Sequence, residues 1–307
     1  MALPLNDTIA PDGKSVSTGM IQLCAAMLII PFLDVFAKLL GQTLDPVQVT
    51  LMRFTMQIIL MAPLVIWARL WKIPKGTLML QFIRGILLAI ATVCFFAALQ
   101  HLPIAEAISI YFVQPLILTA LSVIFLGEVI RRRRIIAILI GLLGVLVILQ
   151  PSVTIFGKPA LLPLVTALAM AGYVAVTRQL AGRAHPYQMQ LVVGLTATVF
   201  LGGIMLAGQF FGFGGTQFIV PNFQEIQWII YIGLVATIGH IFIVWATTNA
   251  PANVLAPFQY LEIVSAVILG YLVFGDTPAT STFIGVSIII SSGVYLFHRE
   301  RIAASQE

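Results

Sequence analysis

Long apolar runs separated by short polar connectors are the dominant pattern of the chain. A membrane-spanning helix needs about 20 predominantly apolar residues. Ten stretches approach or exceed that length, at residues 18–40, 47–69, 77–99, 103–126, 134–149, 160–178, 188–208, 226–246, 252–274 and 278–297. The connectors between them, such as "GQTLDP", "QHLP" and "GDTPA", are too short to hold a soluble domain. The pattern therefore predicts an all-α integral membrane protein with ten transmembrane helices.

Composition points the same way, because 60% of the 307 residues are hydrophobic, only 9% are charged and the mean hydropathy is +1.05. A soluble domain does not have this balance. Residues 1–17 are polar, carry both signs of charge and lack an apolar core, so we expect a cytosolic N-terminal tail there and a cytosolic C-terminal tail at 298–307. Cys24 and Cys94 lie inside apolar runs without metal-ligand spacing. We interpret them as packing residues and expect no metal and no other cofactor.

The basic residues predict the orientation of the chain in the membrane. When alternate connectors are compared, twelve Lys and Arg residues fall on one side and only Lys158 falls on the other. The twelve are Lys14, Arg69, Lys72, Lys75, Arg131, Arg132, Arg133, Arg134, Arg178, Arg183, Arg299 and Arg301. Cytoplasmic loops carry such an excess, so we expect both termini in the cytoplasm and a bacterial inner-membrane location. The basic residues are otherwise scattered, apart from the "RRRR" run that is expected to contact anionic membrane lipids, so no nucleic-acid partner is predicted.

The chain also contains an internal repeat. At a constant offset of 148, several small or polar residues of the first half fall on matching residues of the second: Pro103 on Pro251, Ala98 on Ala246, Gly127 on Gly275 and Glu128 on Asp276. Earlier in each half an offset of 140 places Lys38 on Arg178 and Pro46 on Pro186. Five spans is an odd number, so the second half must start on the opposite side of the membrane. We therefore expect two inverted five-helix repeats, at 18–150 and 160–297, around a central cavity.

The paired motifs resemble a known family. The run "ALQHLPIAEAISIYFVQPLILTALSVIFLGE" is similar to the EamA-type members of the drug/metabolite transporter superfamily, and "VFGD" is a second copy of its Leu-Gly-Glu ending, with Asp276 in place of Glu. Arg53 and Arg84 also resemble family positions. The resemblance implies a ten-helix transporter whose cavity is lined mainly by spans three, four, eight and nine, with the fifth and tenth more peripheral. The second half most resembles bacterial carriers of amino acids, S-adenosylmethionine or vitamins.

Glu262 is an acidic residue inside the ninth predicted span. A charged side chain at mid-membrane costs about 2.5 to 3.5 kcal/mol, and protonating a glutamate of ordinary pKa about 4.3 at pH 7 costs about 3.7 kcal/mol. The two costs nearly match, as a proton-coupling or cation-binding carboxylate requires, so Glu262 is our candidate for proton coupling. Helical spacing places it in one stripe with Gln259, Ser265, Ala266 and Gly270, and we expect this stripe to face the cavity.

The repeat offset places Tyr111 opposite Gln259 and Gln114 opposite Glu262, so we predict that these four residues build a substrate site at the membrane midplane. The alternative is that Glu262 is a helix-packing residue held by an arginine or a hydroxyl group. We add four further candidates for substrate binding: Arg84, Lys38, His240 and Trp245. His240 can also be a satisfied buried histidine, with Trp245 forming an aromatic wall, and Arg84 can be a charge partner instead.

Asp34 and Lys38 are four residues apart on the first predicted span, so they are predicted to form an ion pair. In the functional alternative, Lys38 binds a substrate carboxylate and the pair breaks and reforms between states. Arg53 lies roughly a turn or two inside the start of the second predicted span, and we interpret it as a snorkelling or capping residue. Glu128 and Asp276 end corresponding spans, and we interpret them as structural.

These features together predict a secondary active transporter. It would move a small polar or zwitterionic metabolite by alternating access, coupled to protons or to exchange, as a monomer or homodimer. The first alternative is a multidrug exporter of lipophilic cations, against which Lys38 and Arg84 argue. An ATP-driven pump would need a "GxxxxGK[ST]" loop, and an enzyme would need a catalytic constellation; the sequence shows neither. A membrane scaffold is disfavoured by the buried polar stripe.

Overall fold

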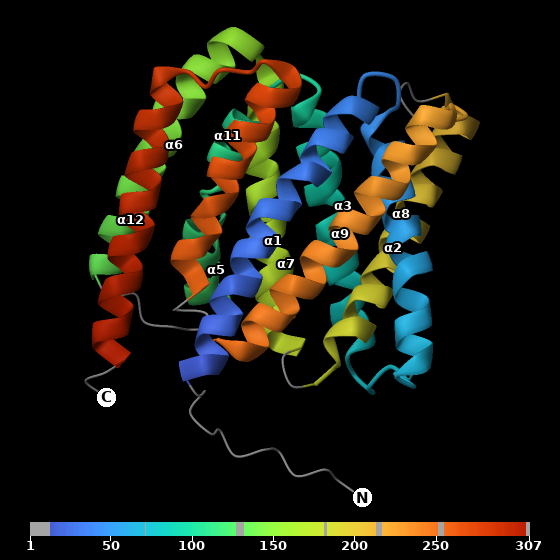
Figure 1. The fold of residues 1–307 in the computed structure, drawn as a ribbon, viewed down its shortest axis with the longest axis horizontal. Helices are drawn as coiled ribbons and strands as arrows, with labels where there is room; N and C mark the ends of the chain where they lie inside the picture. Colours follow the sequence, from blue (N-terminus) through green and yellow to red (C-terminus); the bar gives the residue numbers. More distant parts are fainter. Residues whose placement is uncertain are drawn as a thin grey trace, which may run out of the picture.

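A computed structural model of the chain describes residues 13–70, 72–126, 132–180, 183–212, 217–250 and 255–304. Every regular element in these ranges is a helix (Figure 1). The helices are α1 (Gly13–Leu40), α2 (Pro46–Trp67), α3 (Leu78–Leu99), α4 (Ile104–Tyr111), α5 (Gln114–Leu126), α6 (Arg132–Phe156), η1 (Lys158–Leu161), α7 (Leu162–Leu180), α8 (Pro186–Phe211), α9 (Phe223–Asn249), η2 (Ala256–Tyr260), α11 (Leu261–Phe274) and α12 (Thr280–Ala304).

The helices show a multi-pass membrane architecture. Within the described residues, seven helical segments are long and apolar enough to cross a membrane: Val16–Leu40, Pro46–Trp67, Leu78–Leu99, Leu139–Phe156, Lys158–Thr177, Pro186–Phe211 and Phe223–Ile243. Three shorter apolar segments cover the rest, at Ile104–Leu118, Phe258–Phe274 and Thr280–Ser292. Each predicted span thus overlaps an apolar helical segment. Residues 1–12, most of the predicted N-terminal tail, lie outside the described part.

Two of the predicted spans are not single helices. The stretch 103–126, predicted as one span, is divided into α4 and α5 by a turn at Phe112 and Val113. Pro115 lies in the first turn of α5, where its missing N–H and its ring would both disturb a helix that ran on from Tyr111. In the ninth span, the short 3₁₀ helix η2 precedes α11, and the junction lies at Tyr260 and Leu261. The repeat offset of 148 carries the first break onto the second, since Phe112 falls on Tyr260.

Helix packing follows the same repeat. α1 packs along α9 as α3 packs along α7, and α11 packs on α1 as α5 packs on α7. The pairs α2–α8 and α6–α12 each join equivalent helices of the two halves. Figure 1 shows α6 and α12 side by side at one edge of the molecule, so the peripheral position expected for the fifth and tenth spans agrees with the structure.

Glycines permit two of these contacts. A Cβ atom added to Gly144 on α6 would come within 2.9 Å of the carbonyl oxygen of Gly285 on α12, and a Cβ on Gly285 would meet the Gly144 carbonyl at 2.6 Å. Gly85 on α3 is equally close to Thr196 on α8. Small residues let membrane helices approach closely enough for backbone contact. These glycines therefore fix the helices that surround the interior.

Candidate functional site

The interior holds a cavity of about 1110 Å³. One end of the cavity is marked by the connectors α2–α3 and α7–α8, including Arg69, Lys72 and Arg183. We call this side the basic face. It is the side that the Lys and Arg distribution predicts to be cytoplasmic. Gln188 ties the two connectors together there, because its Nε2 donates hydrogen bonds to the carbonyl oxygens of Leu70 and Lys72 at 2.8 and 2.6 Å.

The cavity walls come from more helices than the resemblance implied. The third, fourth and ninth spans contribute as expected, but α9, the eighth span, contributes only His240 and Ile243. α7, the sixth span, contributes Thr166, Met170, Tyr173, Val174 and Thr177. α1 and α2 add Asp34 and Arg53, so the expectation of a cavity lined mainly by four spans is too narrow.

The four residues predicted to form the midplane site all line the cavity. Tyr111 and Gln114 stand on either side of the turn between α4 and α5, and Gln259 and Glu262 stand on either side of the junction at which the 3₁₀ helix η2 continues into α11. Between them the rings of Phe112 and Tyr260 contact each other, with centroids 5.4 Å apart. The turn and the junction therefore meet at the residues that the repeat places in correspondence.

The polar stripe on the ninth span divides into two parts. Gln259 and Glu262 line the cavity, but Ser265 donates a hydrogen bond of 3.2 Å to the carbonyl oxygen of Leu28 on α1. Ala266 is fully buried. The second half of the stripe thus packs α11 against α1 and does not face the cavity, contrary to the sequence expectation.

Arg53 is the residue that the sequence interpretation missed. Its side chain does not snorkel: it lines the cavity, it is only 3% exposed, and its guanidinium lies 4.3 Å from the Phe54 ring centroid. Nε and Nη1 have no hydrogen-bond partner among the described residues. The signal was present in the sequence, because Val49, Arg53, Gln57 and Met61 repeat every four residues and all are buried on α2.

Asp34 lies near Arg53 in the same cavity. It is buried, and its carboxyl group interacts electrostatically with Glu262 and with Arg53. No carboxylate oxygen of a described residue lies within 4.0 Å of the Arg53 nitrogens. The cavity thus places the acidic side chains of Asp34 and Glu262 beside Arg53, which forms no salt bridge within the described residues.

Arg84 also lines the cavity, but each nitrogen atom of its guanidinium donates a hydrogen bond to a protein group. Nε donates to Thr177 Oγ1 at 2.8 Å, Nη1 to the Met189 carbonyl oxygen at 3.0 Å and Nη2 to the Tyr173 hydroxyl at 2.6 Å. The guanidinium also stacks over the Tyr173 ring at 4.6 Å. These contacts join α3 to α7 and α8. Arg84 is therefore a partner of protein groups in this structure, the second of the two roles considered for it.

The last two candidates differ in position. His240 lines the cavity, and its Nδ1 lies 2.6 Å from the Ala236 carbonyl oxygen one turn earlier on α9. Trp245 is not among the lining residues: it is 42% exposed, and its Nε1 donates a hydrogen bond of 3.2 Å to the Tyr187 hydroxyl. The structure therefore does not bring Trp245 to the candidate site.

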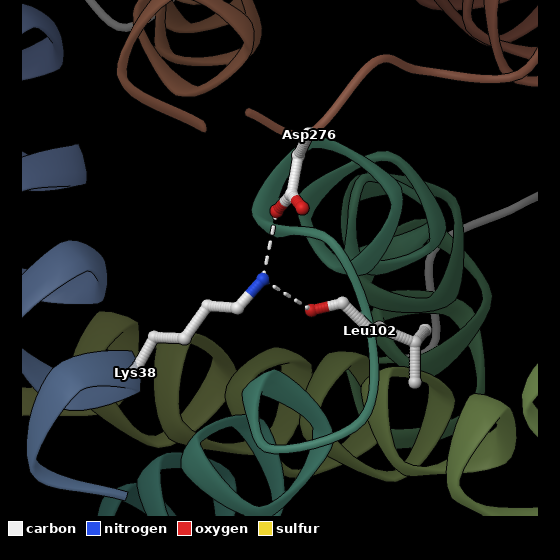
Figure 2. Close-up of polar contacts among 3 residues, drawn as sticks. All are labelled: Lys38, Leu102 and Asp276. Carbon is white, nitrogen blue, oxygen red and sulfur yellow. Dashed lines mark hydrogen bonds and ion pairs between the residues drawn. The ribbon is translucent and has the colours of Figure 1, made fainter. Parts of the chain in front are cut away.

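Lys38 pairs with a residue other than the one predicted. Its Nζ donates hydrogen bonds to Asp276 Oδ2 at 2.7 Å and to the Leu102 carbonyl oxygen at 3.2 Å (Figure 2). Asp276 follows Gly275, whose positive φ of 71° ends α11 and turns the chain toward α1. The predicted Asp34–Lys38 pair is wrong, because Asp34 faces the cavity while Lys38 lies at the connectors beyond it.

We call the side of the molecule that carries this pair the Lys38 face. Three further bonds join its connectors: Gln100 Nε2 to the Gly41 carbonyl oxygen at 2.7 Å, Thr43 Oγ1 to Glu225 Oε1 at 2.6 Å, and Gln48 Nε2 to the Ile219 carbonyl oxygen at 2.6 Å. Glu128, the repeat equivalent of Asp276, lies outside the described residues. Within the described part, the cavity reaches the basic face, and the Lys38 face is held together by side-chain bonds.

The described residues contain no cluster of three or more His, Cys, Asp or Glu side chains that could hold a metal ion.

Comparisons with known proteins agree with the architecture. The model of the EamA-like transporter family matches residues 17–150 and 157–297. The chain is 26% identical over 283 residues to the pseudopaline exporter of Pseudomonas aeruginosa, covering 92% of this chain and 96% of that protein. It is 24% identical over 274 residues to the S-adenosylmethionine uptake transporter of Rickettsia conorii, covering 89% and 90%. A riboflavin transporter of Rhizobium johnstonii is 28% identical over 217 residues, covering 71% and 69%.

A solved crystal structure has the same fold, with a TM-score of 0.64 at 18% identity, covering 94% of this chain and 99% of that one.

Proposed function

The chain belongs to the EamA-like transporter family, and from this membership we propose that it is a secondary active transporter. It moves a small polar or zwitterionic metabolite across the bacterial inner membrane by alternating access. The observation that carries the proposal is the cavity, which joins polar groups at the α4–α5 turn and at the matching η2–α11 junction to one face of the molecule. Helix irregularities near the midplane are a recurring way to build a transporter site.

An inverted repeat of two five-helix halves, with ten crossings in all, is supported by the packing. Each contact between the halves has a counterpart or maps onto itself, as the pairs α1–α9 and α3–α7 or the Phe112–Tyr260 contact illustrate. A protein with such symmetry can exchange the conformations of its halves, which is the basis of alternating access. The arrangement in this structure is open at the basic face and bonded at the Lys38 face, so it corresponds to an inward-open state under the predicted orientation.

The charges in the cavity favour a substrate that carries both signs. Asp34 and Glu262 attract a cationic group, while Arg53 attracts an anionic one. Amino-acid-like and S-adenosylmethionine-like metabolites meet this requirement, and vitamin-like metabolites meet it only where they carry both a cationic and an anionic group. The names of the relatives include both an exporter and an uptake transporter.

The alternative function is export of lipophilic cations. It is favoured by the aromatic wall of the cavity. The ring centroids of Phe95 and Tyr111 lie 6.0 Å apart, and those of Tyr111 and Phe112 lie 5.9 Å apart. A lipophilic cation would, however, be repelled by the unpaired Arg53 in the same cavity. For this reason the metabolite transporter is the better proposal.

Within this function, Glu262 is the proposed proton carrier. It stands at the first turn of α11, lines the cavity and interacts electrostatically with Asp34 and Tyr111. A carboxyl group in this position can exchange a proton with water that enters from the open face.

Transport in liposomes tests both parts of the proposal. The purified protein is reconstituted, loaded with or exposed to a metabolite extract, and assayed with and without a pH gradient. Wild type should accumulate or exchange at least one solute, and Glu262→Gln should lose the response to the gradient. Lys75→Gln, an exposed change outside the cavity, serves as control. A Glu262→Gln response equal to wild type would exclude the proton role, and the absence of any transported solute would exclude the transporter.

A further inference from the structure

Arg53 is a buried cation that forms no salt bridge within the described residues and whose Nε and Nη1 donate no hydrogen bond there. It lies about two turns inside α2, which begins at Pro46, and on the side of the cavity away from the basic face. Buried charges in proteins are normally paired and hydrogen-bonded, because an unpaired one loses its hydration without compensation. At Arg53, Nε and Nη1 lack any such compensation among the described residues.

Arg84, in the same cavity, has protein acceptors at every nitrogen atom. All three of its nitrogen atoms donate hydrogen bonds to α7 and α8. At Arg53 the ring of Phe54 lies under the guanidinium, and Nε and Nη1 have no acceptor among the described residues. The contrast indicates that the acceptor for Arg53 is not part of the folded chain.

The nearby acidic side chains limit the charge that a group bound to Arg53 can carry. Asp34 interacts electrostatically with both Arg53 and Glu262, yet it does not form a salt bridge with Arg53 in the described structure. A doubly charged phosphate would be repelled by the two carboxyl groups. A single carboxylate that carries its own cationic group would bind Arg53 and at the same time neutralise the acids, and the planar guanidinium matches the geometry of a carboxylate.

We propose that Arg53 is the anchor for the carboxylate of the transported substrate, and that Asp34 and Glu262 receive the cationic group of the same molecule. The substrate is thus a metabolite with an amino-acid head group, whose remaining part contacts the apolar wall that includes Phe95, Phe96 and Met170. This assignment rests on the proposed transport function and specifies its substrate class.

A measurement without ligand tests whether Arg53 serves to bind a ligand or to stabilise the fold. The melting temperature of the purified protein is measured for wild type, Arg53→Met and Arg84→Met. Removing an uncompensated buried charge should leave the melting temperature unchanged or raise it. Arg84→Met should lower it, because Thr177, Tyr173 and the Met189 carbonyl lose their partner. An Arg53→Met protein that melts several degrees lower, or that does not fold, would overturn the proposal.

Transport in liposomes then tests the substrate class. The probes are the 20 proteinogenic amino acids and S-adenosylmethionine, each beside a counterpart without the carboxylate charge (the amino-acid methyl ester or decarboxylated S-adenosylmethionine), with phosphoethanolamine as the phosphate-bearing amine. Wild type should transport at least one carboxylate-bearing probe in preference to its counterpart and to phosphoethanolamine. Arg53→Gln should raise its KM about ten- to hundredfold, and Arg53→Lys should restore only part of the loss. Lys75→Gln is the control.

Different results would contradict the Arg53 assignment and the proposed transport function. If wild type transports a solute that lacks a carboxylate, or if Arg53→Gln keeps the wild-type KM, the Arg53 assignment is wrong while the transporter stands. If wild type transports neither these probes nor any solute of a metabolite extract, the proposed function fails and the substrate assignment fails with it.

Discussion

Lys38 on α1 and Asp276 beyond the end of α11 form an ion pair that joins the first helix of one half to the second half of the chain. The two side chains are 17% and 23% exposed, so the pair is partly shielded from solvent. The Leu102 carbonyl oxygen binds the same Nζ and brings in the connector between α3 and α4 (Figure 2). One cation therefore holds three segments together on the Lys38 face.

Breaking this pair should favour the state that is open at the Lys38 face. In Lys38→Met, a loss of about 1 kcal/mol would change the ratio of the two states about fivefold. The measurement uses a background with Cys24 and Cys94 changed to Ser and a single cysteine introduced at Leu33, which lines the cavity. Its labelling by a membrane-impermeant maleimide, added from the side of the Lys38 face, should accelerate several-fold.

Two controls decide the interpretation. Lys158→Gln removes an exposed lysine outside the pair and should leave labelling unchanged. The charge exchange Lys38→Asp with Asp276→Lys should restore slow labelling. Equal labelling of wild type and Lys38→Met would mean that the pair does not hold this face closed.

The contact between the Phe112 and Tyr260 rings should be required for a normal transport rate. Their centroids lie 5.4 Å apart at the two helix breaks, where segments must move if access alternates. Tyr260→Phe keeps the ring and should keep the transport rate in liposomes, whereas Tyr260→Ala should lower it about two- to tenfold by removing an aromatic contact worth about 0.5–1.5 kcal/mol. An equal loss in both variants would assign the role to the hydroxyl group instead.

The sequence predicted the features that depend on local pattern. Apolar runs located each helical segment, and the repeat offset placed Tyr111, Gln114, Gln259 and Glu262 together, as the cavity lining shows. Length, periodicity and symmetry are properties of the chain itself, so one sequence suffices to find them.

The features that were missed depend on packing between distant segments. Lys38 has Asp34 one turn away, yet its partner lies 238 residues along the chain, because the direction in which α1 presents each face was not known. For the same reason, the sequence alone did not show that Arg53 faces the cavity instead of reaching water. The turn at Phe112 lies inside a continuous apolar run, so apolar length alone does not predict it. The local signal is Pro115, which lacks a backbone N–H.

Gly144 should be required for the packing of α6 on α12. In Gly144→Ala the added methyl group would lie 2.9 Å from the Gly285 carbonyl oxygen, so the helices must separate, at a cost of about 1–3 kcal/mol. Gly203→Ala on α8 is the matched control, because no atom lies within 4 Å of the added group. There the higher helix propensity of alanine should stabilise the protein by about 0.5–1 kcal/mol. The melting temperature in detergent should therefore fall for the first variant and rise for the second; a fall in both would point to a different cause.

The hydroxyl group of Tyr173 should contribute to stability through Arg84. It accepts the hydrogen bond from Nη2 at 2.6 Å, and in Tyr173→Phe that buried N–H would lose its partner while the ring under the guanidinium remains. Leaving a buried donor of a charged group unsatisfied costs about 1–3 kcal/mol. The melting temperature of Tyr173→Phe should therefore fall by several degrees, whereas Tyr271→Phe, which removes an exposed hydroxyl from α11, should leave it unchanged. If the two variants melt together with wild type, water must replace the lost hydroxyl, and Arg84 would then be free enough to be reconsidered as a substrate contact.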